Sequence, residues 1–147
     1  MSDLRERLRG RGWRMTAQRR VVAEVLDGEH VHFTADEVHA RAARLLPEIS
    51  RATVYNTLRE MVTLGEVLEV STDDRARRYD PNAHRPHHHL VCSGCGTIRD
   101  VRPTGSPLAD LPPAERFGFV VTAADITYRG LCPDCARQPA AVPEPAP

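Results

Sequence analysis

The chain has 147 residues, a length that fits one domain or two small ones. Acidic and basic residues balance at 20 each, so no overall charge argues for a nucleic-acid or membrane partner. No stretch is long and apolar enough to cross a membrane and the N-terminus lacks the apolar core of an export signal, so we expect a cytoplasmic protein with no membrane partner.

All basic residues are arginine, and seven of them lie within residues 5–20. Such a local excess of positive charge is typical of a phosphate-facing patch, but it also fits a solvated helix face. Charge alone does not separate these two interpretations.

Hydroxyl caps and apolar periodicity predict three helices over the first 65 residues or so. The first begins after Thr16 and ends before Gly28, and the second begins after Thr34, with Glu37 at the capping-box position. Pro47 separates the second from a third helix between Ser50 and Gly65. The residues expected to face the core are Val21, Val22, Val25, Leu26, Val38, Ala42, Leu45, Val54, Leu58, Met61 and Val62.

A hairpin is predicted after these helices, with strands at 67–70 and 76–79 and a polar turn at 71–74. Three helices and a hairpin are the outline of a winged helix-turn-helix, whose third helix enters the major groove of DNA. The alternative is a generic helical bundle with a polar outer face. The exposed polar face of the third helix favours DNA binding, and the candidate contacts there, in the wing and near the N-terminus are Arg14, Arg19, Arg51, Tyr55, Asn56, Arg59, Arg75 and Arg77.

Short strand-like runs follow at 89–91, 98–101, 117–122 and 125–131, with room for only a short helix at 107–116. They predict a small α/β domain that needs a metal or a partner chain for stability. The fold class is therefore α+β, with a domain boundary after residue 83, a second domain at 84–136 and a disordered Pro/Ala-rich tail at 137–147.

Two Cys-x-x-Cys pairs, with 36 residues between them, predict one structural Zn²⁺ per chain, bound by Cys92, Cys95, Cys132 and Cys135. Disulfides would require an oxidising compartment, and a thioredoxin-like motif usually comes as one pair beside a βαβ unit. Zinc is the favoured interpretation, although strong oxidation could still release the metal from the same thiolates.

Histidines at 87–89 run into the first cysteine pair, and Asp80 and Asp100 flank them. Nitrogen and oxygen donors of this kind suit Fe²⁺, Mn²⁺ or Zn²⁺ better than Cu⁺. A second metal site is therefore one interpretation of these residues, and a solvated surface segment is the other.

The chain resembles the ferric uptake regulator (Fur) superfamily from residue 1 to about residue 136. The resemblance rests on the two cysteine pairs and on residues 14–19 (RMTAQR), 32–36 (HFTAD), 50–56 (SRATVYN), 78–80 (RYD) and 87–92 (HHHLVC). It implies a homodimeric, metal-dependent repressor that binds a DNA operator with palindromic half-sites, through an N-terminal winged helix and a C-terminal dimerisation domain.

Within the superfamily the chain is most similar to peroxide-sensing repressors of the PerR type. That resemblance implies one regulatory Fe²⁺ or Mn²⁺ per chain, held by His32, Asp80, His87, His89 and Asp100. It also implies that the metal-bound form binds the operator. Peroxide would then oxidise a ligand histidine, either His32 or His87, and the repressor would leave the operator.

Further expectations about specificity and metal binding concern Asp100, Ala123, Ala124 and His88. Asp100 favours peroxide sensing, because iron sensors of the family usually carry Glu there. Ala123 and Ala124 replace histidines of a further metal site found in many relatives, so we expect that site to be missing. His88 has no assigned role.

Three other functions are alternatives to peroxide sensing. Within the family, the alternative is a sensor of iron, zinc or manganese availability. Outside it, the histidines and Asp100 could form a hydrolase site or a metal store, but no general base or nucleophile is placed beside them, so we expect no enzyme.

Overall fold

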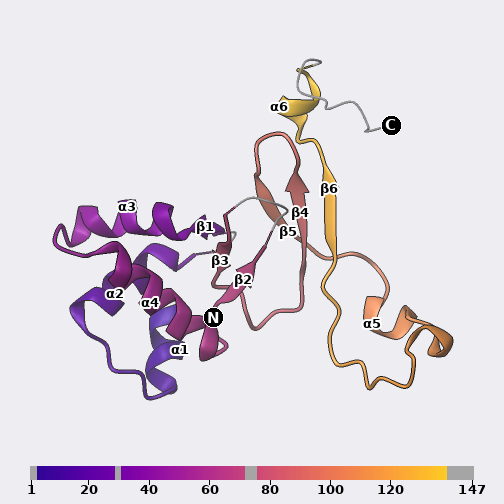
Figure 1. Ribbon diagram of the computed structural model, residues 1–147, viewed down its shortest axis with the longest axis horizontal. Helices are drawn as coiled ribbons and strands as arrows, with labels where there is room; N and C mark the ends of the chain where they lie inside the picture. Colours follow the sequence, from indigo (N-terminus) through magenta and orange to yellow (C-terminus); the bar gives the residue numbers. More distant parts are fainter. Residues whose placement is uncertain (1–2, 29–30, 72–75, 139–147) are drawn as a thin grey trace. The chain divides into compact units, whose positions relative to one another are not determined.

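The computed structural model describes residues 3–28, 31–71 and 76–138. It divides into two compact units, Met1–Arg85 and Pro86–Pro147 (Figure 1). The sequence predicted a boundary after residue 83. The tail beyond residue 138, within the expected disordered segment, lies outside the described residues.

In the described residues of the first unit, helices lead into a small antiparallel sheet of order β1-β3-β2 (Figure 1). The helices are α1 (Leu4–Gly10), α2 (Ala17–Leu26), α3 (Ala35–Leu45) and α4 (Arg51–Thr63). The strands are β1 (Phe33–Thr34), β2 (Leu68–Val70) and β3 (Arg78–Asp80). The β2–β3 hairpin after α4 is the predicted wing.

The predicted caps form as side-chain hydrogen bonds. The Thr16 hydroxyl accepts from the Arg19 N–H at the start of α2, and the Ser50 hydroxyl accepts from the Thr53 N–H at the start of α4. At α3, Thr34 and Glu37 make the reciprocal bonds of a capping box. These caps fix where each helix starts, and therefore which face of α4 points away from the core.

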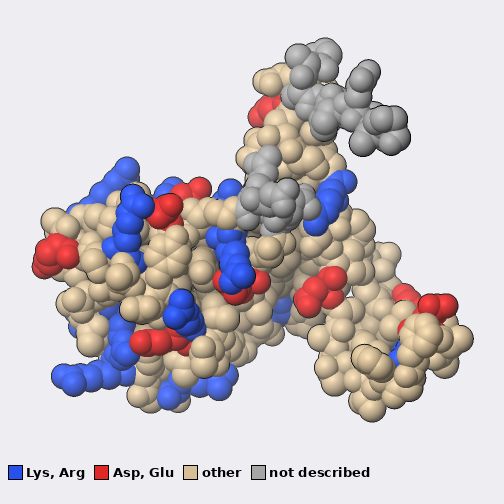
Figure 2. All heavy atoms as spheres, in the orientation of Figure 1, with Lys and Arg blue, Asp and Glu red and all other residues tan. Residues whose placement is uncertain are grey.

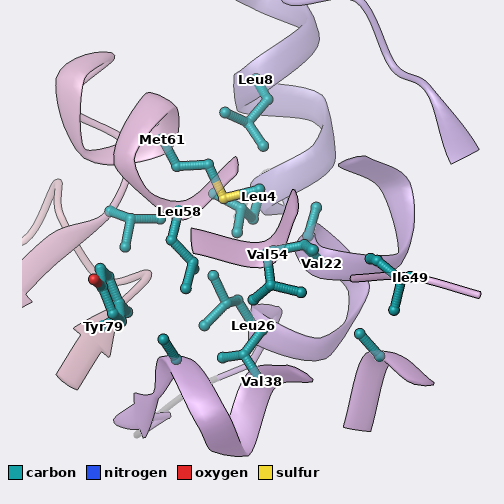
Figure 3. Close-up of a cluster of buried hydrophobic side chains, with 14 residues drawn as sticks. Leu4, Leu8, Val22, Leu26, Val38, Ile49, Val54, Leu58, Met61 and Tyr79 are labelled. Atoms are coloured by element: carbon teal, nitrogen blue, oxygen red, sulfur yellow. The ribbon is translucent and has the colours of Figure 1, made fainter. Parts of the chain in front are cut away.

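A single apolar core holds the helices together, as Figure 3 shows. Side chains from all four helices and from β3 meet in it, and most of them are fully buried. Among them are Leu4, Leu8, Val22, Leu26, Val38, Ile49, Val54, Leu58, Met61 and Tyr79.

Two expectations for this unit were wrong. The expected three helices miss α1, whose Leu4 and Leu8 are fully buried. The Leu45 side chain was expected to face the core but is 54% exposed, because it is the last residue of α3 and the chain turns away there. Its neighbour Leu46 packs against the core instead.

The second unit is built on a three-stranded sheet of order β5-β4-β6. Its elements are β4 (His88–Cys92), β5 (Ile98–Val101), α5 (Pro107–Asp110), the 3₁₀ turn η1 (Pro113–Glu115), β6 (Thr127–Gly130) and α6 (Pro133–Ala136). The β5 strand pairs with β4 in antiparallel register, and β6 pairs with it in parallel register. The central strand thus carries His88, His89 and Cys92, and His87 directly precedes it.

The strand expected at 117–122 is not formed. Phe117 has a φ of 47° and Gly118 a φ of 76°, so the chain turns there, and the Phe119 N–H donates to the Arg116 carbonyl. A strand exists only when a neighbouring strand satisfies its backbone groups, and this run is paired with neither sheet of the chain. Phe117, Phe119 and Val120 are 81%, 76% and 91% exposed.

None of the helices in the described ranges is long and apolar enough to span a bilayer.

Candidate metal centres and DNA-binding surface

The four cysteines converge at one end of the second unit. Cys92 is the last residue of β4, and Cys95 lies on the following turn. Cys132 is the N-cap of α6, and Cys135 lies within that helix. Their sulfurs all lie within 4.8 Å of one another, and the Cys95 and Cys132 sulfurs are 3.9 Å apart. Tetrahedral zinc with Zn–S bonds of about 2.3 Å needs sulfurs about 3.8 Å apart. The cluster therefore fits a zinc ion.

Backbone N–H groups make the cluster favourable for thiolates. The N–H groups of Cys132 and Cys95 donate to the Cys92 sulfur at 3.3 and 3.5 Å, and they lower the pKa of its thiol to about 6. The neighbouring sulfurs of Cys132 and Cys92 act in the opposite direction on Cys135 and raise the pKa of its thiol to about 12. The cause is mainly the hydrogen bonds that the protonated Cys135 thiol makes to those sulfurs. A divalent cation bound between the sulfurs would take the place of that proton and stabilise all four thiolates.

Gly94 is required for the close approach of the two cysteine turns. A Cβ built on Gly94 would lie 2.8 Å from the Cys135 sulfur and 3.0 Å from the Cys135 Cβ. Both distances are shorter than van der Waals contact, so any side chain at this position would displace a zinc ligand.

A second donor set consists of His87, which directly precedes β4, His89 on β4 and Asp100 on β5. The Asp100 Oδ1 atom lies 3.6 Å from His87 Nε2 and 3.7 Å from His89 Nε2. The two imidazole rings meet edge to face, with centroids 4.8 Å apart. His89 is directly opposite Asp100 in the strand pairing, so the sheet register itself brings these groups together.

The first unit contributes a separate pair, His32 and Asp80. His32 Nε2 lies 3.3 Å from Asp80 Oδ2, and both side chains are almost fully buried. The other Asp80 oxygen, Oδ1, accepts from the Asn82 N–H at 2.8 Å, which fixes the orientation of the carboxylate. A buried carboxylate beside a buried imidazole is a donor set suited to a divalent cation.

His88, which sequence reasoning left unassigned, has a structural contact. Its Nδ1 accepts a hydrogen bond from the Ile126 N–H at 3.0 Å, just before β6. This bond points away from the face used by His89 and ties β4 to the segment that carries Ala123 and Ala124.

The outer face of α4 carries the polar side chains expected to meet DNA. Arg51, Tyr55, Asn56 and Arg59 are all exposed, and Tyr55 is 44% exposed. Figure 2 shows arginine side chains distributed over the helical unit. A cavity of about 470 Å³ lies between this face and the hairpin, and Tyr55, Arg59 and Arg77 are among the residues that line it.

The remaining DNA candidates differ in how far they are engaged within the chain. Arg14 is exposed, whereas Arg19 stacks on the Trp13 ring at 4.4 Å and donates to Glu60 at 2.8 Å. Arg77 donates to Glu69 at 3.0 Å, so binding a phosphate requires exchange of this surface ion pair. Arg75 lies outside the described residues.

Sequence reasoning missed a buried charge cluster around Glu66. Its carboxylate is nearly inaccessible and contacts Arg7, Arg11 and His84. The signal that could have found it is an acidic residue at a core position, directly before the buried Val67.

A winged helix, a zinc-fitting cysteine cluster and His/Asp donor sets together define a metal-responsive transcription regulator. The comparisons with known proteins agree, since the model of the ferric uptake regulator family matches residues 10–108. The chain belongs to this family, and the curated relatives that it matches are transcriptional regulators and repressors.

Individual relatives carry different specificities. The chain is 35% identical to the peroxide-responsive repressor PerR of Staphylococcus epidermidis, over 89% of this chain and 87% of that protein. It is 32% identical to the transcriptional regulator FurA of Mycobacterium tuberculosis, over 91% and 90%. Among solved structures, a zinc-bound manganese uptake regulator matches with a TM-score of 0.68 and 29% identity, over 89% of this chain and 99% of that one.

Proposed function

We propose that the protein is a peroxide-sensing repressor, whose metal-bound form binds a DNA operator and whose ligand histidines are the target of oxidation. The regulatory ion is Fe²⁺ or Mn²⁺, one per chain, held by His32, Asp80, His87, His89 and Asp100. The ion in the cysteine cluster is structural Zn²⁺.

The observation that carries the proposal is the aspartate that faces the two imidazoles. Asp100 Oδ1 is within 3.7 Å of both His87 and His89, so a cation between them needs only small side-chain movements. The short aspartate arm at this position is the feature that the family resemblance associates with peroxide sensing. The PerR relative supports the same specificity.

His32 and Asp80 belong to the DNA-binding unit, whereas the other three ligands belong to the second unit. In the proposal all five hold the same ion, so their binding favours one arrangement of the two units. An ion that binds one arrangement more tightly shifts the population toward it. A bias of about 3 kcal/mol would change DNA affinity about 150-fold.

Fe²⁺ held by these residues would supply the electron that reduces hydrogen peroxide to hydroxide and a hydroxyl radical, and the ion would itself be oxidised to Fe³⁺. The chain's part is to hold unprotonated imidazole nitrogens next to that reaction, so that His32 or His87 becomes the oxidised group. An oxidised ring is a poor ligand, and its loss leaves the ligand set incomplete. The repressor then releases its operator.

Homodimerisation is part of the proposal, because two recognition helices are needed for palindromic half-sites. Its support in the chain is the exposed apolar run that contains Phe117, Phe119 and Val120. A contiguous apolar surface of this kind indicates an interaction site. A second copy of the chain would cover it and would offer the strand partner that a single chain lacks.

A sensor of metal availability is the second candidate. The similarity to a zinc-bound manganese uptake regulator supports it, as does the similarity to FurA. The same donors would bind Mn²⁺ or Fe²⁺ without any oxidation step.

Operator binding by the purified dimer distinguishes the two candidates. Fluorescence anisotropy of promoter DNA would be followed with Mn²⁺ and with Fe²⁺, each with and without hydrogen peroxide. A peroxide sensor loses DNA only in the Fe²⁺ form and gains 16 Da on a His32 or His87 peptide. An availability sensor keeps its DNA and its mass in all four conditions.

Two variants test the ligand set. His32→Ala should abolish metal-dependent DNA binding while the zinc content and the dimer stay intact, because His32 is outside the zinc-binding unit. Asp100→Glu should keep metal-dependent repression but respond less to peroxide. Normal operator binding by His32→Ala at saturating Mn²⁺ would contradict the proposed ligand role.

A further inference from the structure

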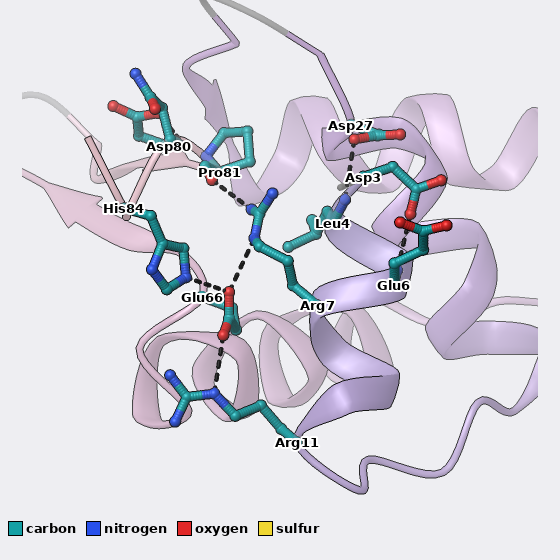
Figure 4. Close-up of polar contacts among 11 residues, drawn as sticks. Asp3, Leu4, Glu6, Arg7, Arg11, Asp27, Glu66, Asp80, Pro81 and His84 are labelled. Carbon is teal, nitrogen blue, oxygen red and sulfur yellow. Dashed lines mark hydrogen bonds and ion pairs between the residues drawn. The ribbon is translucent and has the colours of Figure 1, made fainter. Parts of the chain in front are cut away.

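Glu66 is a buried acid surrounded by three basic side chains, as Figure 4 shows. One carboxylate oxygen, Oε2, accepts from Arg7 Nε at 2.9 Å and lies 2.6 Å from His84 Nε2. The other, Oε1, accepts from Arg11 Nε at 2.9 Å. The cluster joins α1 to the turn before β2 and to the end of the first unit.

Arg7 makes a second contact that Arg11 does not show. Its terminal nitrogen donates to the Pro81 carbonyl at 2.7 Å (Figure 4). Pro81 directly follows Asp80, which is buried and faces His32.

The segment after β3 is therefore held at three successive points. The Asp80 carboxylate accepts from the Asn82 N–H, the Pro81 carbonyl accepts from Arg7, and His84 contacts Glu66. Charge-assisted hydrogen bonds from a planar guanidinium restrict both distance and direction. A segment fixed in this way holds its carboxylate in one orientation before any ion binds.

We propose that Arg7 and Glu66 act as positioning residues for Asp80, so that helix α1 sets the affinity of the regulatory ion. The inference rests on the proposed function, because it takes Asp80 as a metal ligand. A ligand that is already oriented loses less conformational freedom on binding, and partners that orient metal ligands typically change affinity by about 10–100-fold.

Arg7→Gln and Arg11→Gln form a matched pair for the test. Each removes one positive charge and the hydrogen bond from its Nε atom to Glu66, but Arg7→Gln also releases the Pro81 carbonyl. We expect Arg7→Gln to weaken Mn²⁺ binding about tenfold by isothermal titration calorimetry. Arg11→Gln should stay within about twofold of the unmodified protein, because it leaves the Asp80 segment in place.

Two further readouts separate positioning from general loss of stability. Amide hydrogen exchange at Asn82 in the metal-free protein should become faster in Arg7→Gln than in Arg11→Gln. At saturating Mn²⁺ the two variants should bind operator DNA equally, since they carry the same net charge. If Arg7→Gln does not fold, His84→Ala tests the same segment, because the His84 ring is half exposed and the buried Glu66 carboxylate keeps its bonds to Arg7 and Arg11.

The outcomes are distinguishable. Equal Mn²⁺ affinity in Arg7→Gln and Arg11→Gln, or unchanged affinity in His84→Ala if that variant has to be used, overturns the inference. If His32→Ala binds Mn²⁺ as tightly as the unmodified protein does, the proposed function is overturned instead.

Discussion

The Gly94→Ala substitution is the sharpest test of how tightly the cysteine turns are packed. The new Cβ would lie 2.8 Å from the Cys135 sulfur, whereas an ordinary carbon–sulfur contact is nearer 3.6–3.8 Å by the usual spacing of packed atoms. The sulfur or the turn must therefore move by about 0.8–1 Å. Zinc sites tolerate only about 0.2 Å of deviation in ligand distance, so the variant cannot keep four good bonds without shifting its backbone.

The expected cost follows from that displacement. Zinc affinity should fall by about 10–100-fold, equivalent to about 1.4–2.7 kcal/mol. The apparent affinity would be measured by competition with a coloured chelator, and the zinc-dependent gain in melting temperature by calorimetry. Gly130→Ala is the control, because Gly130 lies in the same unit and a Cβ built on it would have no other atom within 4 Å. Equal chelator competition by Gly94→Ala and Gly130→Ala would refute the reasoning.

Three further predictions concern the first unit. Burial alone would raise the pKa of the Glu66 carboxyl, but hydrogen bonds from His84, Arg11 and Arg7 lower it below 4.5. The ionised Glu66 carboxylate therefore stabilises the fold above pH 4.5, and this stabilisation is lost as the pH falls through the lowered pKa. The stability gap between the unmodified protein and Glu66→Gln, measured by urea unfolding, should therefore shrink on acidification; a constant gap would contradict this. Leu58→Ala should lower the free energy of unfolding by about 2–5 kcal/mol, whereas Leu68→Ala, at a 37% exposed position, should cost much less. Thr34→Ala should cost about 0.5–2 kcal/mol by removing the cap of α3, and an unchanged melting temperature would exclude a role for that cap.

Local signals in the sequence were sufficient for much of the fold. A capping hydroxyl acts within one turn of its own helix, so Thr16, Thr34 and Ser50 located three helix starts without any tertiary information. The paired cysteines were equally informative, because each Cys-x-x-Cys spacing already places two sulfurs on one turn. The sequence also placed His89 and Asp100 on strands that proved to be neighbours.

Helix α1 was missed because its signal is short and mostly charged. Leu4 and Leu8 are its only buried residues, and five of its other positions are polar, charged or glycine. The arginines of this region looked like one basic patch in the sequence. In the folded chain Arg7 and Arg11 turn toward Glu66, so part of that charge is used internally.

Helix starts, ligand types and the order of the cysteine pairs and histidines could be read from the amino-acid sequence, because they depend on neighbours within a few residues. Tertiary structure alone decided which groups met across long separations, as Glu66 met Arg7 and His84. It also decided that residues 117–122 would not form a strand, since a strand depends on a backbone partner that local sequence does not specify.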